Sequence, residues 1–220
     1  MKKGWKIFWI ICAVLAGMGA VFFVAGIALG ADFSYFRQCF YGSGSEQEIS
    51  SFEMEGITAL DIDVSATEVN LYPADASNIK VDLYGRFHKH TTCIKDGETL
   101  KIDMHHGNHW FKFGKAHNKI DIYIPRTLKL KEADFDLNAV KLLSDGIDME
   151  NIDIDINAGM AEFTGISVDG HNYKIEMNLG TAKIGDQTFE ALTKEQILNN
   201  QAEFQVDIDG NMSEVIIKEK

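Results

Sequence analysis

The stretch Asn151–Gly165, NIDIDINAGMAEFTG, decides the fold that this sequence predicts. Apolar and polar residues alternate up to Asn157, and a second alternating run begins after Ala158 and Gly159. Alternation with period two places every second side chain on the same face of a β-strand, so one face is apolar and the other is acidic. A short break between two such runs indicates two strands that are joined by a sharp bend.

The same two-part pattern recurs on both sides of this stretch. An earlier run, FDLNAVKLL, starts at Phe135, and two later runs, IEMNLGTAKI and VDIDGNMSEV, start at Ile175 and Val206. A further copy, IDVSATEVNL, starts at Ile62 with Ser65 at its break. In the four aligned runs the spacings between break residues are 19, 21 and 31 residues, and the break residues are Asn138, Asn157, Asn178 and Asp209.

A repeat of about 20 residues predicts an all-β solenoid. One rung cannot bury its apolar face alone, but stacked rungs share a continuous core. We therefore expect a β-helix of about four to six rungs. Its break residues would form a column at one corner, where a left-handed backbone turns the chain. An antiparallel β-sandwich is the alternative, because its strands also come about every 8–12 residues.

Further alternating runs precede the repeats and also predict strands, at residues 59–64, 68–72, 79–85, 99–104 and 119–125. The one helix signal in the body is LTKEQILNNQ, Leu192–Gln201, in which Thr193 and Gln196 form a capping box. We expect a short inserted helix there. It would bulge from a rung or cover an open end of the solenoid, where apolar surface and free edge groups are exposed.

The N-terminal segment predicts a membrane anchor. Residues 7–31 are 25 residues without a charge, and as a helix they would span roughly 37 Å, enough for a hydrocarbon core of about 30 Å. Lys2, Lys3 and Lys6 precede them, so the positive-inside rule places the N-terminus in the cytoplasm and the body outside. A cleaved signal peptide ending in ALGA is the alternative, but a signal core has only about 7–15 apolar residues.

The chain therefore divides into three parts. Residues 1–31 are the cytoplasmic tip and the transmembrane anchor, and residues 32–50 are an aromatic juxtamembrane stretch followed by a Gly/Ser spacer. Residues 51–220 are the extracytoplasmic β-solenoid domain. We expect a single-pass protein of the cell membrane.

The body is strongly acidic. The formal net charge is −12, and residues 1–31 contain three of the 21 basic residues and none of the 33 acidic ones, so the remainder carries 18 − 33 = −15. Such a body excludes nucleic-acid binding through phosphate neutralisation. Anionic lipids and wall polymers would also repel it unless divalent cations intervene.

A segment between two predicted strands contains candidate site residues. Neutral imidazoles at high density can bind Zn²⁺ and other transition metals, and the candidate ligands are His105, His106, His109 and His117. Trp110, Phe111 and Phe113 lie in the same segment and are candidate binding residues for a sugar or the membrane. A solvated hairpin tip with neither role is the alternative.

Aspartates occupy many positions that we expect to face outward, namely Asp61, Asp63, Asp121, Asp134, Asp136, Asp148, Asp153, Asp155, Asp207 and Asp209. Stacked carboxylates repel one another, and Ca²⁺ would relieve that repulsion. A solvated face that prevents edge pairing is the alternative. The sequence thus indicates no obligatory cofactor and leaves Zn²⁺ and Ca²⁺ open.

No catalytic motif is present. The sequence has no G-x-S-x-G elbow, no H-E-x-x-H, no P-loop and no G-x-G-x-x-G. It has no CxxC pair either, and Cys39 and Cys93 could form a disulfide outside a cell or stay unpaired. We expect that the protein is not an enzyme, with a carbohydrate-active enzyme as the alternative.

Three features resemble the bacterial putative-adhesin β-solenoid family of LiaG type, a domain of unknown function. They are the opening FEMEGITALDIDVSATEVNLY from Phe52, the strand IDIYIP from Ile120, and short rungs such as LGTAKIG from Leu179. The resemblance covers about residues 52–220 and implies a single-span or secreted envelope protein, often encoded with envelope-stress genes. It implies no catalytic residues. The predicted helix and the histidine-rich segment depart from the family pattern.

We therefore expect a non-catalytic, membrane-anchored module of the bacterial cell envelope that acts as an adhesin or a scaffold. Its partners beyond the membrane would be an envelope glycan or a membrane protein. An envelope-stress sensor that acts through its span is the main alternative, since Gly26 and Gly30 would let another helix approach closely.

Overall fold

The computed structural model describes residues 48–85, 91–104, 118–190, 196–198 and 201–219, which belong to one compact unit. These residues form fourteen β-strands, so the expected all-β fold is confirmed. Within this described part no helix could cross a membrane. The anchor predicted at residues 7–31 lies outside it.

Three strands are much longer than the others. They are β8 (Leu130–Asp145), β9 (Met149–Thr164) and β14 (Phe204–Lys218). The short strands are β1 (Glu48–Met54), β2 (Ala59–Ser65), β3 (Glu68–Ala74), β4 (Ile79–Tyr84), β5 (Thr91–Asp96), β6 (Thr99–Met104), β7 (Lys119–Pro125), β10 (His171–Met177), β11 (Gly180–Ile184), β12 (Gln187–Glu190) and β13 (Gln196–Leu198).

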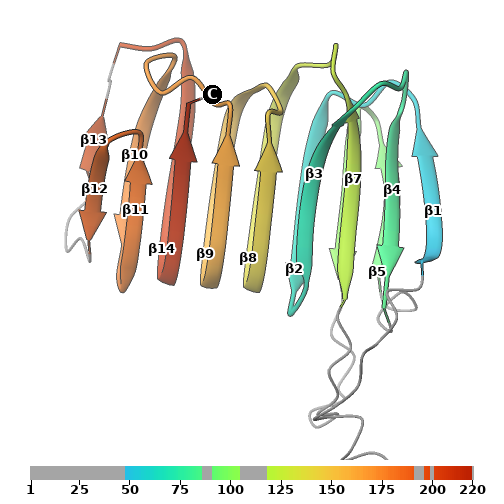
Figure 1. The fold of residues 1–220 in the computed structure, drawn as a ribbon, viewed down its shortest axis with the longest axis horizontal. Coiled ribbons are helices and arrows are strands. Elements are labelled where there is room, and N and C mark those ends of the chain that lie inside the picture. Colours follow the sequence, from blue (N-terminus) through green and yellow to red (C-terminus); the bar gives the residue numbers. More distant parts are fainter. Residues whose placement is uncertain (1–47, 86–90, 105–117, 191–195, 199–200, 220) are drawn as a thin grey trace, which may run out of the picture. The chain divides into compact units, whose positions relative to one another are not determined.

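The long strands bend near their middle and so contribute to two layers. Their first halves join the first layer, in the order β5-β6-β2-β8-β9-β14-β10-β13. Their second halves join the second layer, in the order β1-β4-β7-β3-β8-β9-β14-β11-β12. Figure 1 shows these strands side by side across the domain. The central strands pair in parallel, as stacked solenoid rungs do, and antiparallel strands complete both ends.

The rungs do not stack in the order of the sequence. The last strand, β14, pairs in parallel with β9 on one side and with β10 and β11 on the other. It therefore lies between two rungs that are consecutive in the chain, and Figure 1 shows it there in red. The C-terminal strand thus completes the middle of the stack.

The apolar faces of both layers meet in one core. Because the parallel strands are in register, Phe135, Ile154, Ile208 and Ile175 form a continuous row in the first layer. All of them are buried. The Phe135 ring meets the ring of Phe163 from the second layer edge-on, at a centroid distance of 5.7 Å. Each such side chain contributes about 1.5–3 kcal/mol of burial free energy, so the shared core holds the two layers together.

The bends of the rungs form one edge of the domain, which we call the corner edge. We expected the left-handed residue to be the break residue itself, but in three rungs it is the next residue, namely Ala66 (φ 50°), Ala139 (φ 57°) and Ala158 (φ 66°). In β14 it is Met212 (φ 54°), three residues after the predicted break residue Asp209. Adjacent rungs approach closely here. A Cβ atom added to Gly159 would lie 2.1 Å from the carbonyl oxygen of Val140.

The predicted column of break residues is present, with one correction. Asn138 pairs in register with Ser65 and with Asn157. In β14 the column residue is Asn211, whose side-chain nitrogen donates to Asn157 Oδ1 at 3.2 Å. Asp209 instead pairs with Asp155. A shift of two residues keeps the same side chains on the same face, so the alternation did not reveal it.

The helix that we predicted for residues 192–201 is wrong where this segment is described. Gln196–Leu198 form strand β13, which pairs antiparallel with β10. Without β13, the backbone groups along the edge of β10 would be unpaired. Pairing at this sheet edge outweighs the local capping signal, because a short isolated helix gains little from its cap alone.

Candidate functional site

Outward-facing carboxylates on adjacent strands of the first layer form two rows. Strands β2, β8, β9, β14 and β10 pair side by side and in register, so equivalent outward positions are neighbours. The first row consists of Asp61, Asp134, Asp153 and Asp207 and ends at Lys174. The second row consists of Asp63, Asp136, Asp155, Asp209 and Glu176. We call this surface the acidic face.

The spacing of the acidic face follows from sheet geometry. Neighbouring strands lie about 4.8 Å apart, and positions on one face of a strand repeat about every 6.6 Å. The carboxylates therefore form a nearly regular lattice. They surround a shallow groove of about 500 Å³, which is lined by nine carboxylates and one lysine.

Few of these carboxylates have a basic partner. Lys101 Nζ lies 3.4 Å from Asp61 at one end, and Lys174 Nζ lies 3.7 Å from Glu176 at the other. The neutral Gln205 amide donates to Asp207 at 2.8 Å. Among the described residues, no lysine or arginine forms an ion pair with the central carboxylates Asp134, Asp136, Asp153, Asp155 and Asp209. The centre of the acidic face therefore keeps most of its negative charge.

Burial and mutual repulsion raise the pKa of three central aspartates. For Asp134, Asp153 and Asp155, partial burial is the larger cause. Neighbouring carboxylates raise the pKa further, since Asp153 acts on Asp134 and Asp207 acts on Asp153. Both causes disfavour the charged form of the carboxyl group. The acidic face therefore holds its charge at an electrostatic cost, which a bound cationic group would relieve.

The layout favours a ligand with distributed positive charge over a chelated ion. No three His, Cys, Asp or Glu side chains converge on a metal-binding point in the described ranges. Ca²⁺ requires about six to eight oxygen atoms at about 2.3–2.6 Å, whereas these carboxylates project from a flat sheet at intervals of about 4.8 Å. Ammonium and guanidinium groups can pair with such carboxylates one by one.

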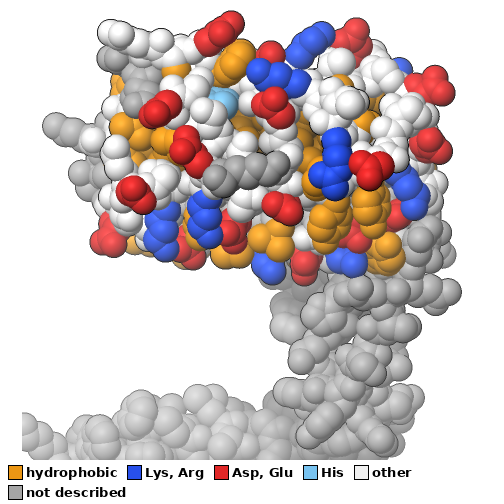
Figure 2. All heavy atoms as spheres, turned by 45° about the horizontal axis from the view of Figure 1, so that its top comes forward, with side chains coloured by type: hydrophobic (Ala, Val, Ile, Leu, Met, Phe, Trp, Pro, Cys, Tyr) orange, Lys and Arg blue, Asp and Glu red, His pale blue; other side chains and the backbone are white. Residues whose placement is uncertain are grey.

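The outer face of the second layer differs from the acidic face, because carboxylates there form ion pairs with lysines. We predicted that Asp121 faces solvent, but only 4% of it is exposed. Its carboxylate accepts from Asn70 at 2.9 Å and lies 3.2 Å from Lys119 Nζ. Asp82 on the neighbouring strand lies 2.8 Å from Lys80 Nζ. In Figure 2 acidic and basic side chains are interspersed over the side that faces the viewer.

The histidine and aromatic candidates from the sequence lie outside the described residues. They are His105, His106, His109, His117, Trp110, Phe111 and Phe113. The described residues on either side, Met104 and Asn118, lie at the corner edge. Met104 follows Asp103, which pairs with Asp63, and the carbonyl oxygen of Asn118 accepts from the Glu68 backbone N–H at 3.0 Å.

One cysteine and one histidine belong to the described part, and both have structural roles. Cys93 is a buried free thiol, and burial raises its pKa to about 12. His171 is also buried, with Nδ1 2.8 Å from the carbonyl oxygen of Ser167 and Nε2 3.1 Å from that of Met149. Both ring nitrogens therefore face backbone carbonyl groups, and His171 ties together the loops that enter β9 and β10.

Comparison with known proteins gives a family and a set of distant structures. The family model described as Toastrack DUF4097 matches residues 57–208, in agreement with the resemblance found in the sequence. No curated protein matches at a significant level. A putative cell adhesion protein from Clostridium sporogenes is 13% identical, with a TM-score of 0.46 over 80% of this chain and 100% of that chain. A putative adhesin from Bacteroides fragilis is 11% identical, with a TM-score of 0.34 over 80% and 98%.

Proposed function

This chain belongs to the Toastrack DUF4097 family, and from this membership and the geometry of the acidic face we propose that it is a non-catalytic binding module of the bacterial cell envelope. Its ligand is a basic polypeptide segment, which the acidic face binds. Its N-terminal segment, residues 7–31, anchors it in the cell membrane with the β-domain outside.

The observation that carries this proposal is the lattice of carboxylates, whose central members form no ion pair with a described lysine or arginine. Five strands present acidic side chains at a regular spacing, and the central ones have no basic partner in the described part of the chain. A lysine- or arginine-rich segment that lies across the strands could pair with successive members of one row. Such pairing also steers encounter over long range, which suits a module at a surface.

The described residues support a binding role over catalysis. The thiol of Cys93 is buried and protonated at neutral pH, and both nitrogens of His171 are engaged by backbone carbonyl oxygens. Catalysis by either residue would require access to a substrate and an adjacent reacting partner. The acidic face offers a broad, shallow surface, which suits contact with an extended ligand.

Binding of oligolysine to the full-length chain in detergent micelles tests the proposal. The test variant replaces three residues of the first row, Asp134→Asn, Asp153→Asn and Asp207→Asn. The matched control removes the same charge elsewhere, with Asp75→Asn, Asp148→Asn and Asp186→Asn, all exposed residues outside the acidic face. We expect the test variant to bind oligolysine at least about tenfold more weakly than the control variant at 0.15 M salt.

Two results would contradict this function. Equal weakening by both variants would show that only net charge matters, and the acidic face would then have no special role. Saturable binding of Ca²⁺ that oligolysine cannot displace would identify the carboxylate rows as a cation site.

A further inference from the structure

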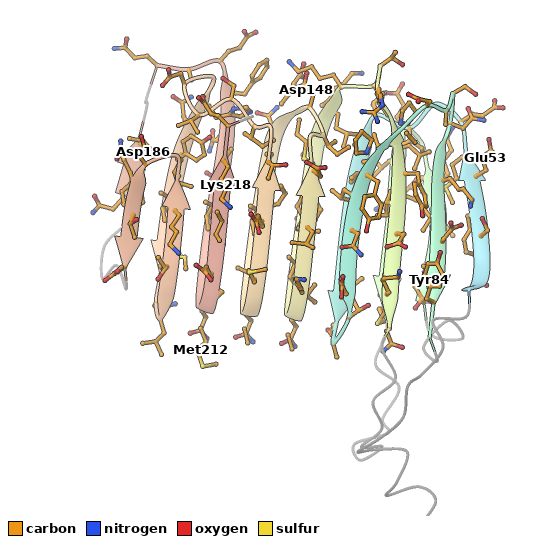
Figure 3. The ribbon with its side chains drawn as sticks, in the orientation of Figure 1. Glu53, Tyr84, Asp148, Asp186, Met212 and Lys218 are labelled. Carbon is orange, nitrogen blue, oxygen red and sulfur yellow. The ribbon has the colours of Figure 1, made fainter. Side chains whose placement is uncertain are left out.

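The corner edge carries a ridge of apolar side chains. The residues that follow the column of break residues are neighbours along this edge, and we call them the corner ridge: Ala66, Ala139, Ala158, Met212 and Leu179. Met212 and Leu179 are 58% and 59% exposed, respectively. Figure 3 shows Met212 projecting from the lower edge of the domain, where the rungs bend. Two large apolar side chains thus face outward next to each other at a position where solvent would favour polar residues.

Four residues of the ridge adopt a left-handed backbone, although glycine or asparagine could form the same bend with less strain. Met212 adopts φ 54°, and the three alanines lie between 50° and 66°. A side chain with a Cβ atom costs about 1–2 kcal/mol in this region, whereas glycine or asparagine adopts it readily. Retained strain of this kind is a reason to look for a function at the site.

The chain enters the domain at the same edge. Strand β1 begins at Glu48, which pairs with Tyr84, and Tyr84 pairs in turn with Lys119. Lys119 pairs with Glu68, two residues beyond Ala66 of the corner ridge. The first described residue therefore lies at the level of the corner edge. Met104 and Asn118, which flank the aromatic segment 105–117, lie there as well.

We propose that the corner ridge rests on the lipid bilayer, with Met212 and Leu179 inserted at the level of the headgroups. This inference rests on the membrane anchoring of the proposed function. Sixteen residues, 32–47, separate the predicted span from β1, and even a fully extended chain of this length reaches only about 53–58 Å. The edge at which β1 begins is thereby tethered within this distance of the membrane surface.

The chemistry beside the ridge suits this contact. The column of Asn138, Asn157 and Asn211 separates the ridge from the acidic rows, so the ridge itself carries no charge. The three alanines of the ridge line a shallow groove of about 810 Å³, whose other lining residues include Met160, Lys119, Lys141 and Glu68. Lys141 is exposed and can extend toward lipid phosphate groups, whereas Lys119 is held by Asp121 at 3.2 Å. The acidic face, which anionic lipids would repel, belongs to the first layer and not to this edge.

Fluorescence quenching in phosphatidylcholine liposomes tests the proposal with the full-length chain. An environment-sensitive fluorophore is attached at Ala139→Cys on the ridge or at Asp148→Cys, which Figure 3 places at the opposite edge from Met212. Cys12→Ser and Cys39→Ser remove the other reactive thiols, while Cys93 is buried. Each label is then exposed to a lipid-borne quencher and to aqueous iodide.

We expect the lipid-borne quencher to act mainly on the Ala139→Cys label and iodide mainly on the Asp148→Cys label. The Ala139→Cys label exists in two populations, one in contact with lipid and one exposed to water, which fluorescence lifetimes distinguish. Replacing Met212 and Leu179 by asparagine should lower the ratio of the first population to the second by about tenfold or more. Met212→Leu is the matched control and should preserve the contact. Because asparagine tolerates the left-handed backbone, Met212→Asn should not unfold the domain.

The outcomes separate this inference from the proposed anchoring. Extraction of the protein from membranes by alkaline carbonate would refute the anchoring and, with it, the ridge contact. If the chain resists extraction but both labels respond alike, only the ridge contact is refuted. If neither quencher reached the Ala139→Cys label, a second copy of the chain or another protein would cover the ridge. That result would overturn the lipid contact.

Discussion

Removing one charge from the centre of the acidic face should stabilise the domain. Asp153 lies between Asp134 and Asp207 in the first row. No lysine or arginine of the described chain forms an ion pair with it. Burial and the charge of Asp207 raise its pKa by more than Lys174 and a hydrogen bond from the Ile154 backbone lower it. Asp153→Asn keeps the shape of the side chain and removes the repulsion with both neighbours.

The magnitude follows from the strand spacing. Two unit charges about 4.8 Å apart repel by about 0.9 kcal/mol in bulk water, and screening at 0.15 M salt reduces this to about 0.5 kcal/mol. With two neighbours, we expect Asp153→Asn to raise the free energy of unfolding by about 1 kcal/mol. For a domain of this size that corresponds to an increase in Tm of about 2–4 °C.

Thermal unfolding of the full-length chain in detergent, followed by circular dichroism, measures this gain. The raised pKa means that the folded wild type binds its proton more tightly than the unfolded chain. Its stability therefore falls as the pH rises through the folded pKa, and the repulsion is fully present at pH 7. Below about pH 3 Asp153 is neutral in both states, so the advantage of Asp153→Asn should disappear. In 1 M salt it should fall to about a third, because the Debye length shortens to about 3 Å.

The control is Asp148→Asn, an exposed residue in the turn between β8 and β9. It should change Tm little at any pH. If Asp153→Asn were neutral or destabilising at pH 7, or if its gain persisted in acid, mutual repulsion would not govern the acidic face. The basis for a cationic ligand would then be lost.

Further predictions concern the corner edge and the buried side chains. Ala139→Gly should raise the free energy of unfolding by about 0.5–1 kcal/mol by relieving the left-handed backbone, whereas Ala59→Gly within β2 should lower it, as urea titration will show. Gly159→Ala should cost at least about 3 kcal/mol, since its Cβ atom would collide with a backbone oxygen 2.1 Å away; a normal yield of folded protein would contradict the close rung contact. His171→Ala should cost about 2–4 kcal/mol in the same titration, because it removes a buried ring that is hydrogen-bonded to the backbone and opens a cavity. Cys93 should react with iodoacetamide at pH 8 only after denaturation, which mass spectrometry can measure; rapid labelling of the folded protein would show that the thiol is accessible.

The sequence predicted the strands, their apolar faces and much of the candidate site. Alternation correctly placed Ile154 and Ile156 in the core and Asp153 and Asp155 outside. It could not show which carboxylates remain uncompensated. Asp121 has the same local pattern, but it is buried by partners from other parts of the chain, including Asn70. Compensation of a charge depends on what neighbouring strands supply.

What the sequence alone determined is therefore the rung: two alternating runs, a bend after residues such as Asn138 and Asn157, and one buried face. The tertiary structure decided how the rungs assemble. It inserted β14 between β9 and β10, placed Asn211 instead of Asp209 in the corner column, and formed β13 at an open sheet edge. Alternation is a local property of the extended backbone and is unchanged when a strand shifts by two residues or takes a different neighbour. The register and order of the rungs are set instead by non-local backbone pairing and closure of the shared core, which operate only when distant segments of the chain have come together.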